Sequence, residues 1–439
     1  MSSDCDRRRS LVYASFDRFP APKGAATHIR AFVDALSRQF AMVDLVTVAP
    51  PATEPRAMMP PAMMPPAMRP LATEPLVAWN SVIHRSPTAS RSQDSALGQS
   101  SWEHCPTGVR HTPLPALGAT LVERVLHFRE HLRAFWRNRR PNVAHVRSIF
   151  EGYPIARDKR HWCDRLVFEV NGLPSIELKY HYPRVADDRE LMKKLIAQEQ
   201  CCLEAADLVV TVSRVNAAYL RSLGVPRAKL RVIPNGVDPR LFSYQPPRPW
   251  ADREARFLYS GTLSPWQGVG VAIEALALYR RDAAARLSIV GSARPGQREQ
   301  LETLAQRLGV LSHIDFHVSA NQLDLAAMHH AADAVLAPLV ANDRNLLQGC
   351  CPLKVLEAMA SGTPLVASGL PVVTALARPD VDALMVRPGS AKALKDALLR
   401  LRGDFRLADQ LSKSARQRIE SRFTWRIAER RLARAYRLV

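Results

Sequence analysis

Residues 257–290 read FLYSGTLSPWQGVGVAIEALALYRRDAAARLSIV, and this stretch decides the fold class. It begins with the short β-rich run 257–260, passes through a glycine-containing loop, and continues as an apolar helical run. A second β-rich run, 287–290, closes it. Two strands separated by one helix form a βαβ unit, and such units favour a parallel sheet with helices on its faces.

The same alternation continues in both directions from this unit. Further strands are predicted toward the C-terminus at 314–317, 334–337 and 364–367, each followed by a helical run. Toward the N-terminus, the pattern predicts strands at 11–16, 43–48, 143–146, 166–170, 208–212 and 231–233, with helices at 27–40, 121–140 and 191–205. The sequence therefore predicts an α/β protein of two Rossmann-like, doubly wound domains, with the ligand site where the carboxyl ends of both sheets meet.

The predicted organisation places an acceptor-side Rossmann-like domain at 1–240, a linker at 241–252 and a second domain at 253–423. A last helix, 424–439, is expected to cross back to the first domain. Residues 51–118 are rich in proline and methionine, and proline removes backbone donors and fixes φ. We predict a disordered insertion or long loop there, with a protein-binding arm as the alternative.

Composition narrows the function classes. The 439 residues are 47% hydrophobic and 23% charged, which is typical of globular proteins. No apolar run approaches the ~20 residues of a membrane-spanning helix. Seven cysteines, among them two adjacent pairs, form no disulfide framework and show no zinc-ligand spacing, so a cytoplasmic location is expected. The net charge of +20 favours an anionic partner, such as nucleic acid, a membrane surface or a small molecule, without choosing among them.

Two motifs carry a family resemblance. The run Val232–Asp238 (VIPNGVD) follows a strand that begins after Asp207, and Pro352–Pro364 reads PLKVLEAMASGTP. Both resemble segments of the retaining nucleotide-sugar glycosyltransferases of the GT-B fold, the family-4 type, and the resemblance covers the chain outside 51–118. It implies two Rossmann-like domains that face each other across a cleft. It also implies transfer of a sugar from a nucleotide-sugar donor to an acceptor, with retention of the anomeric configuration.

The resemblance assigns the nucleotide-sugar site to the second domain. Glu357 would hold the ribose, because a carboxylate on a helix facing the cleft can accept hydrogen bonds from both ribose hydroxyls. The chain departs from the family at the diphosphate: Thr262 stands where the family usually has arginine, and Gln267 where it has lysine. Gly349 replaces a further glutamate that usually touches the transferred sugar.

Other groups are expected to replace the missing cations. Lys354 and Arg344 lie in the same loop–helix segment as Glu357 and are predicted to bind the diphosphate. The helix start after Gly268 would add free N–H groups on the same side, with Gln267 and Thr262 beside it. Gly24, at the first strand–helix turn, would approach the phosphates from the first domain. No metal or other cofactor is expected, because cationic side chains and helix dipoles take its place.

Three residues at strand ends of the first domain are candidates for catalysis. Asn171 aligns with a histidine that the family commonly places near the reacting carbon. Glu169 could orient or deprotonate the acceptor, and His145 could approach it, although a buried packing histidine is an equal alternative. His28 is predicted to be structural or to make a contact between the domains.

The acceptor is the open part of this interpretation: a lipid-linked molecule, a polysaccharide or a small molecule would each fit the family. The basic helix that contains Arg133 and Arg137, with Phe135 and Trp136 beside them, would suit an anionic surface and peripheral association with the inner membrane face, but a solvated helix face is the favoured alternative. Two other functions stay open: a catalytically silent nucleotide-sugar-binding or scaffold protein, and a basic protein that binds membrane surfaces or nucleic acid. Of these partners, nucleic acid is the one least expected, since no nucleic-acid-binding motif is present.

Overall fold

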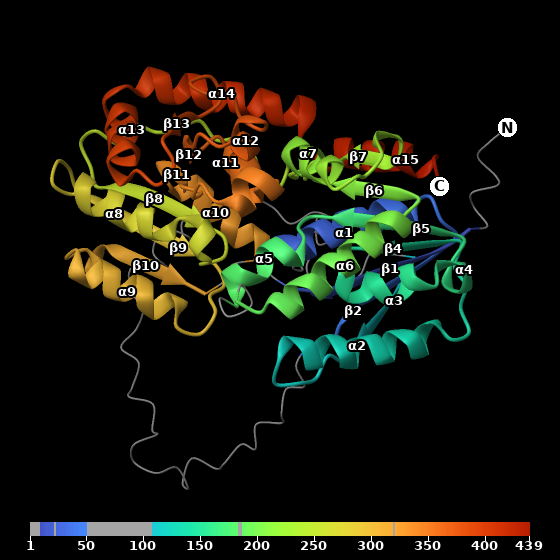
Figure 1. Ribbon diagram of the computed structural model, residues 1–439. Helices are drawn as coiled ribbons and strands as arrows, with labels where there is room; N and C mark the ends of the chain where they lie inside the picture. Colours follow the sequence, from blue (N-terminus) through green and yellow to red (C-terminus); the bar gives the residue numbers. More distant parts are fainter. Residues whose placement is uncertain (1–8, 22, 51–107, 183–186, 319–320) are drawn as a thin grey trace, which may run out of the picture. The chain divides into compact units, whose positions relative to one another are not determined.

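The computed structural model describes residues 9–21, 23–50, 108–182, 187–318 and 321–439, and these form two parallel α/β sheets flanked by helices (Figure 1). The first sheet has seven strands in the order β3-β2-β1-β4-β5-β6-β7. Its strands are β1 (Ser10–Arg18), β2 (Met42–Val48), β3 (Val109–Leu114), β4 (Val143–Val146), β5 (Arg165–Val170), β6 (Leu208–Thr211) and β7 (Leu230–Val232).

The second sheet has six strands in the order β10-β9-β8-β11-β12-β13, which is the classic doubly wound arrangement. Its strands are β8 (Ala255–Ser260), β9 (Ala285–Val290), β10 (Ile314–His317), β11 (Ala334–Ala337), β12 (Leu365–Ser368) and β13 (Leu384–Val386). All strand pairs in both sheets are parallel. The predicted pair of Rossmann-like domains of the GT-B type is therefore confirmed.

Helices connect the strands. In the first domain they are α1 (Gly24–Ser37), α2 (Leu121–Trp136), α3 (Ile149–Arg157), α4 (Lys159–Trp162), α5 (Pro174–His181), α6 (Arg189–Ala205) and α7 (Arg214–Ser222). The second domain contains α8 (Val269–Tyr279), α9 (Gln297–Arg307), α10 (Gln322–Ala331), α11 (Leu353–Ser361), α12 (Pro371–Thr374), α13 (Ala391–Gly403) and α14 (Phe405–Arg422), and α15 (Trp425–Tyr436) ends the chain.

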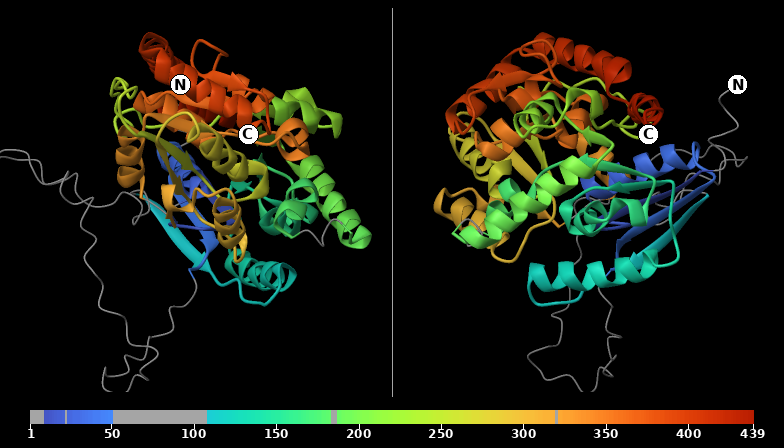
Figure 2. Two further views of the ribbon diagram at one scale, coloured as in Figure 1. Left: turned by 90° about the vertical axis from the view of Figure 1, so that its left-hand side faces the viewer. Right: turned by 45° about the vertical axis from the view of Figure 1, so that its right-hand side comes forward.

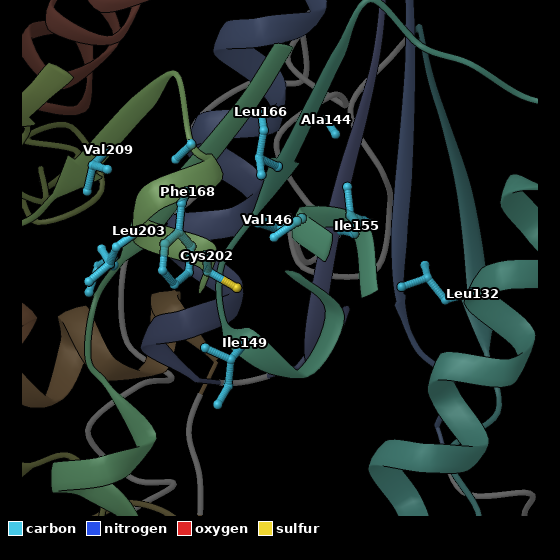
Figure 3. Packing of buried hydrophobic residues seen from close by; sticks show 14 of the residues in the cluster. Leu132, Ala144, Val146, Ile149, Ile155, Leu166, Phe168, Cys202, Leu203 and Val209 are labelled. Atoms are coloured by element: carbon cyan, nitrogen blue, oxygen red, sulfur yellow. The ribbon is translucent and has the colours of Figure 1, made fainter. Parts of the chain in front are cut away.

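The core of the first domain lies between its sheet and the helices that cover it. Figure 3 shows Ala144, Val146, Leu166 and Phe168 of the central strands among side chains from α2, α3 and α6, and each is 1% exposed or less. Because parallel strands are covered on both faces, consecutive residues of one strand are buried, which explains the continuous apolar runs in the sequence. This packing fixes where the strands end, and the functional residues follow those ends.

α2 shows how a local sequence sets an element of this layer. Thr120 and Glu123 form a capping box at its N-terminus, which satisfies backbone N–H groups that have no intrahelical partner. The predicted apolar stripe is confirmed, since the structure buries Val125, Phe128 and Leu132. Phe135 and Trp136 are buried too, so the expectation that these two aromatic residues lie beside the arginines on an outer, anionic-surface-binding face is wrong. The apolar period of the helix turns both rings inward.

One predicted boundary is also wrong. Residues 109–114 were expected to belong to the proline-rich insertion, but they form β3, which pairs in parallel with β2. β3 is an edge strand, and an edge strand tolerates Pro113 because one side of its backbone needs no ladder partner. Residues 51–107, the rest of the predicted insertion, lie outside the described residues.

The last helix, α15, packs on the first domain although it follows the second in the chain (Figures 1 and 2). Ala428, Leu432 and Ala435 are buried in the same cluster as Ile29 of α1 and Leu11 of β1. The linker before the second domain carries Trp250, which is 2% exposed and belongs to the core of that domain. In the part of the chain that the structure describes, no helix is long and apolar enough to cross a bilayer.

Candidate functional site

A pocket of about 430 Å³ lies where strands of both sheets end. Lys23, His28 and Arg147 line it from the first domain, and Ser260 and Glu357 are among the residues that line it from the second. The first three follow β1 or β4, and Ser260 ends β8, so the pocket is at the carboxyl ends of the strands, as doubly wound sheets predict. Four cations and one carboxylate line this pocket among the described residues: Lys23, Arg147, Arg344, Lys354 and Glu357.

Lys354, on the first turn of α11, is positioned by neighbours from the β8–α8 segment. Its Nζ donates a hydrogen bond of 2.8 Å to Oε1 of Gln267 and lies 3.9 Å from the centre of the Tyr259 ring. Gly261 makes room for it, because a Cβ there would lie 2.9 Å from Nζ. Burial lowers the pKa of Lys354 to about 7, and the nearby charge of Glu357 acts in the opposite direction.

Glu357 lies one turn further along α11 and is 8% exposed. In the part of the chain that the structure describes, no group hydrogen-bonds or ion-pairs with its carboxylate. Burial raises the pKa of Glu357 to about 7, and the charge of Lys354 opposes that shift. A carboxylate that is largely buried, faces a pocket and lacks a protein partner is available to a ligand with hydroxyl donors.

Arg344 lies in a π-helical turn, η8 (Arg344–Gln348), and lines the same pocket. Its guanidinium carbon is 5.1 Å from the centre of the Trp266 ring, and its Nε is 2.5 Å from a carboxylate oxygen of Glu177 on α5. The arginine is thus held between an aromatic face of the second domain and an acid of the first. Thr262 also lines the pocket, and its side chain is uncharged.

Two helices begin at the pocket without a side-chain cap. α1 starts at Gly24 after Lys23, and α11 starts at Leu353, and neither N-cap side chain accepts a hydrogen bond from its helix. A Cβ on Gly24 would meet Leu353 at 3.0 Å, so the two helix starts are close together. Free N–H groups and the positive ends of two helix dipoles favour an anion here.

The helix start after Gly268 differs from expectation, because Gly268 is not among the residues that line the pocket. Its φ of +75° and a Cβ position only 1.8 Å from the Pro338 carbonyl oxygen show that glycine is required there for the turn and the close backbone approach. The structure therefore explains the glycine at position 268 by its backbone conformation and close packing, and not by a contact with the pocket.

Beneath the first-domain wall lies a network around Glu169 of β5, which is fully buried. Its partners are the hydroxyl of Tyr13 at 2.9 Å, Nε2 of His145 at 2.9 Å, Nε of Arg147 at 3.0 Å, the amide of Asn171, and Nε2 of His28 at 2.8 Å. We call these six residues the Glu169 network. Burial alone would raise the pKa of Glu169, but the charges of His28 and Arg147 and the hydrogen bond from His145 hold it well below its usual range.

The three catalytic candidates divide within this network. Asn171 lines the pocket, and its Oδ1 is buried without a hydrogen-bond partner in the described structure. Glu169 and His145 are 0% exposed and do not line it. Nδ1 of His145 is close to the Tyr436 hydroxyl of α15, so both of its ring nitrogens are engaged. Neither side chain therefore reaches the pocket surface in the described structure.

Some pocket residues were not assigned a role from sequence. Arg147, Lys23 and Asn235 are among these residues, and all three line the pocket. A signal existed for two of them, since Arg147 directly follows β4 and Lys23 directly precedes α1. Ser260 carried no signal. Its Oγ is buried and has no hydrogen-bond partner in the described structure.

Direct hydrogen bonds join the two domains beside the pocket. Nδ2 of Asn235 donates to the Cys351 carbonyl at 2.8 Å, and Oε1 of Gln348 accepts from the backbone N–H of Leu173 at 2.8 Å. Lys179 also pairs with Asp343. Cys350 and Cys351 line the pocket, but burial raises the pKa of both thiols, to about 12 for Cys351. Within the described ranges, no cluster of three or more His, Cys, Asp or Glu side chains has the arrangement of a metal site.

Both halves of the chain match models of known protein families. Residues 22–241 match the model described as Glycosyltransferase Family 4, and residues 243–418 match the model described as Glycosyl transferases group 1. A D-inositol 3-phosphate glycosyltransferase of Xylanimonas cellulosilytica is 26% identical over 336 residues, which covers 72% of this chain and 76% of that protein.

Solved structures agree on the fold. A sucrose-phosphate synthase from Thermosynechococcus elongatus superposes with a TM-score of 0.69 at 22% identity, covering 98% of both chains. HepE of Anabaena, solved in complex with UDP-glucose, superposes with a TM-score of 0.68 at 15% identity, covering 98% of this chain and all of that one.

Proposed function

Because the chain belongs to the family-4, group 1 glycosyltransferases of the GT-B fold, we propose that it moves a sugar from a nucleotide-sugar donor to an acceptor with retention of the anomeric configuration. The single observation that carries the donor assignment is the carboxylate of Glu357, which faces the pocket without a protein partner beside the buried ammonium of Lys354. A sugar nucleotide offers both counterparts, hydroxyl donors for the acid and a diphosphate for the base.

The charge of the pocket supports an anionic donor. Four basic side chains and one acid line it within the described residues, and two helices begin there without caps. A nucleoside diphosphate leaving group gains negative charge as the bond to the sugar breaks. Cations and helix starts that are already in place stabilise that charge without reorganising, which is where most of the lowering of a barrier arises in such sites.

The uncharged residues Gln267 and Thr262 at the diphosphate position are explained if cations from another segment of the second domain take over phosphate binding. The family usually has lysine at the position of Gln267, and here the ammonium of Lys354 lies 2.8 Å from that glutamine side chain. We therefore propose that the positive charge is supplied from α11 instead of from the β8–α8 loop. Arg344, stacked on Trp266, is proposed to replace the second cation in the same way.

The proposed roles in the first domain follow from what reaches the pocket. Gly24 allows the start of α1 to approach the phosphates closely, and Lys23 adds a charge beside it. Asn171 is proposed to lie near the reacting carbon, since its unpartnered Oδ1 is in the pocket wall. Because HepE was solved with UDP-glucose, UDP and UDP-glucose are the first probes of the donor class.

A thermal-shift screen of the full chain against a panel of nucleotide sugars tests this function. A donor that binds only the folded state raises the melting temperature by linkage. The best donor is then incubated with the protein alone and with candidate acceptors, and the anomeric configuration of the product is read by NMR. Slow donor hydrolysis and a retained configuration are expected. Stabilisation by a donor with no turnover in any condition would instead identify a silent nucleotide-sugar-binding protein.

A further inference from the structure

Both ring nitrogens of His28 face hydrogen-bond acceptors. Its Nδ1 lies 2.7 Å from Oδ1 of Asn235, and its Nε2 lies 2.8 Å from Oε1 of Glu169. The residue is 3% exposed, so water cannot replace either partner freely. A neutral imidazole carries one N–H and can satisfy only one of these acceptors, whereas an imidazolium carries two.

The orientation of the Asn235 amide is set by its other contact. Its Nδ2 donates to the carbonyl oxygen of Cys351 at 2.8 Å, and a carbonyl can only accept. Turning the amide around would place two oxygens against each other. Oδ1 of Asn235 must therefore face His28, and Nδ1 of His28 must carry a proton.

The contact with Glu169 requires the second proton. The Nε2–Oε1 approach is off the line of a straight hydrogen bond, and it is an ion-pair contact at 2.8 Å. A deprotonated Nε2 would place its electron density 2.8 Å from a buried carboxylate oxygen, and the two would repel each other. The rings of Phe32 and Trp425 pack beside the imidazole, with centroids 4.0 and 6.1 Å from it.

His145, in the same network, provides the contrast. Its Nε2 donates to Glu169, but its Nδ1 faces the hydroxyl of Tyr436, which can donate as well as accept. A neutral imidazole satisfies both contacts, and burial lowers the pKa of His145 in agreement with that state. The two histidines that share one carboxylate therefore differ in charge because their second partners differ.

We propose that His28 is an imidazolium whose charge helps the first-domain wall of the pocket attract the diphosphate of the donor, and that Glu169 is the positioning residue that keeps it charged. The groups that face His28 are Glu169 from β5, Asn235, and the rings of Phe32 and Trp425. Arg147 and Asn171 contact the same carboxylate oxygen of Glu169 as His28 does, and His145 contacts the other oxygen. Since both nitrogens are occupied, His28 acts on the ligand through space. The electrostatic part of this inference rests on the proposed function.

The protonation state is measured first, in the ligand-free wild-type protein. Long-range ¹H–¹⁵N spectra of protein labelled at histidine report whether each ring nitrogen carries a proton, and His28→Gln identifies the signals of His28. Two protonated nitrogens for His28 and one for His145 are expected at pH 7. A single ring proton on His28 overturns the proposal, whatever the protein binds.

The effect on binding is measured with inorganic pyrophosphate and with UDP by calorimetry. His28→Gln is expected to weaken both about three- to tenfold at pH 7, since it removes one cation from the pocket wall. Glu169→Gln is expected to convert the His28 signals to those of a neutral ring, which a purely structural change would not do. Asp382→Asn is the control, because Asp382 is an equally buried carboxylate, paired with Arg378, that does not line the pocket.

The outcomes separate the two proposals. Unchanged pyrophosphate and UDP affinity in a folded His28→Gln protein overturns the electrostatic role of His28. A wild-type protein that binds neither probe contradicts the proposed function instead, and the NMR spectra still decide the charge of His28. If Glu169→Gln does not fold, the wild-type spectra and the His28→Gln titration remain decisive.

Discussion

Two carboxylates that are nearly inaccessible to solvent serve the same pocket in opposite ways. Glu169 in the first domain is 0% exposed and is contacted by five side chains, whereas Glu357 in the second is 8% exposed and has no hydrogen-bond or ion-pair partner among the described residues. Their pKa values move in opposite directions. The pKa of Glu169 is held well below its usual range by neighbouring cations and donors, although burial alone would raise it, while burial raises that of Glu357 to about 7.

The difference shows how a structure separates framework from binding site. A buried charge that is fully hydrogen-bonded orders its neighbours, and removing one partner leaves the others uncompensated. A buried charge without partners costs stability in the free protein, and a ligand must repay that cost. The first state is typical of a positioning group, and the second is typical of a group that contacts ligand.

The largest effect is expected from breaking the framework. Glu169→Ala leaves Arg147 and His28 without their shared counter-charge, so the free energy of unfolding should fall by about 3–5 kcal/mol in urea denaturation. A loss below about 1 kcal/mol would mean that the Glu169 network does not order this part of the first domain.

Replacing Glu357 should weaken ligand binding without destabilising the ligand-free protein. Glu357→Ala is expected to lower donor affinity at least tenfold by calorimetry, and unchanged binding would remove the residue from the site.

Glu357→Gln should raise the stability of the ligand-free protein by about 1–2 kcal/mol at pH 8. Because the pKa of Glu357 is raised to about 7 in the folded protein, its carboxyl group contributes stability below about pH 4.5, and this contribution is lost as pH rises through 7. The difference in stability between Glu357→Gln and the wild-type protein should therefore narrow toward pH 5.

The exchange of roles between Lys354 and Gln267 can be tested by reversing it. Lys354→Gln should weaken UDP binding about tenfold, because one diphosphate cation is lost. Gln267→Lys alone places a second ammonium beside the first and should also weaken it. The double variant returns a single lysine to the position usual in the family and should recover most of the affinity. A double variant no better than Lys354→Gln contradicts the exchange.

The smallest effect concerns pH. Since burial lowers the pKa of Lys354 to about 7, the ligand-free ammonium loses its proton above that pH, and a bound diphosphate must restore it. UDP affinity of the wild-type protein, relative to Lys354→Met, should therefore fall about fivefold between pH 7 and 8. Taking the ratio to the variant cancels the titration of UDP itself. A flat ratio would show that Lys354 does not change its protonation on binding.

The sequence predicted most of the fold because parallel strands buried on both faces leave continuous apolar runs. The predicted strands 143–146, 314–317 and 334–337 coincide with β4, β10 and β11. β13 and β3 were missed, and both lie at the edges of their sheets; the edge position also accepts the proline of β3. Neither strand carries the composition by which a central strand is recognised.

The site was less predictable because its residues meet only after folding. Glu357, Lys354 and Arg344 were found from one local loop–helix segment, but the contact between Lys354 and Gln267 joins positions 87 residues apart. The Glu169 network draws on three strands, one helix and two loops, and no spacing along the chain encodes it. Local patterns name candidates, and long-range packing decides which of them reach the pocket.

The place of α15 has a consequence for how the protein is made. Leu432 and Tyr436 complete the apolar core beside α1, and the hydroxyl of Tyr436 lies against His145 of the Glu169 network. During synthesis, the domain that emerges first from the ribosome must therefore wait for α15 to be translated. A fragment cut in the linker would leave that core uncovered, so the acceptor-side half should be expressed together with α15.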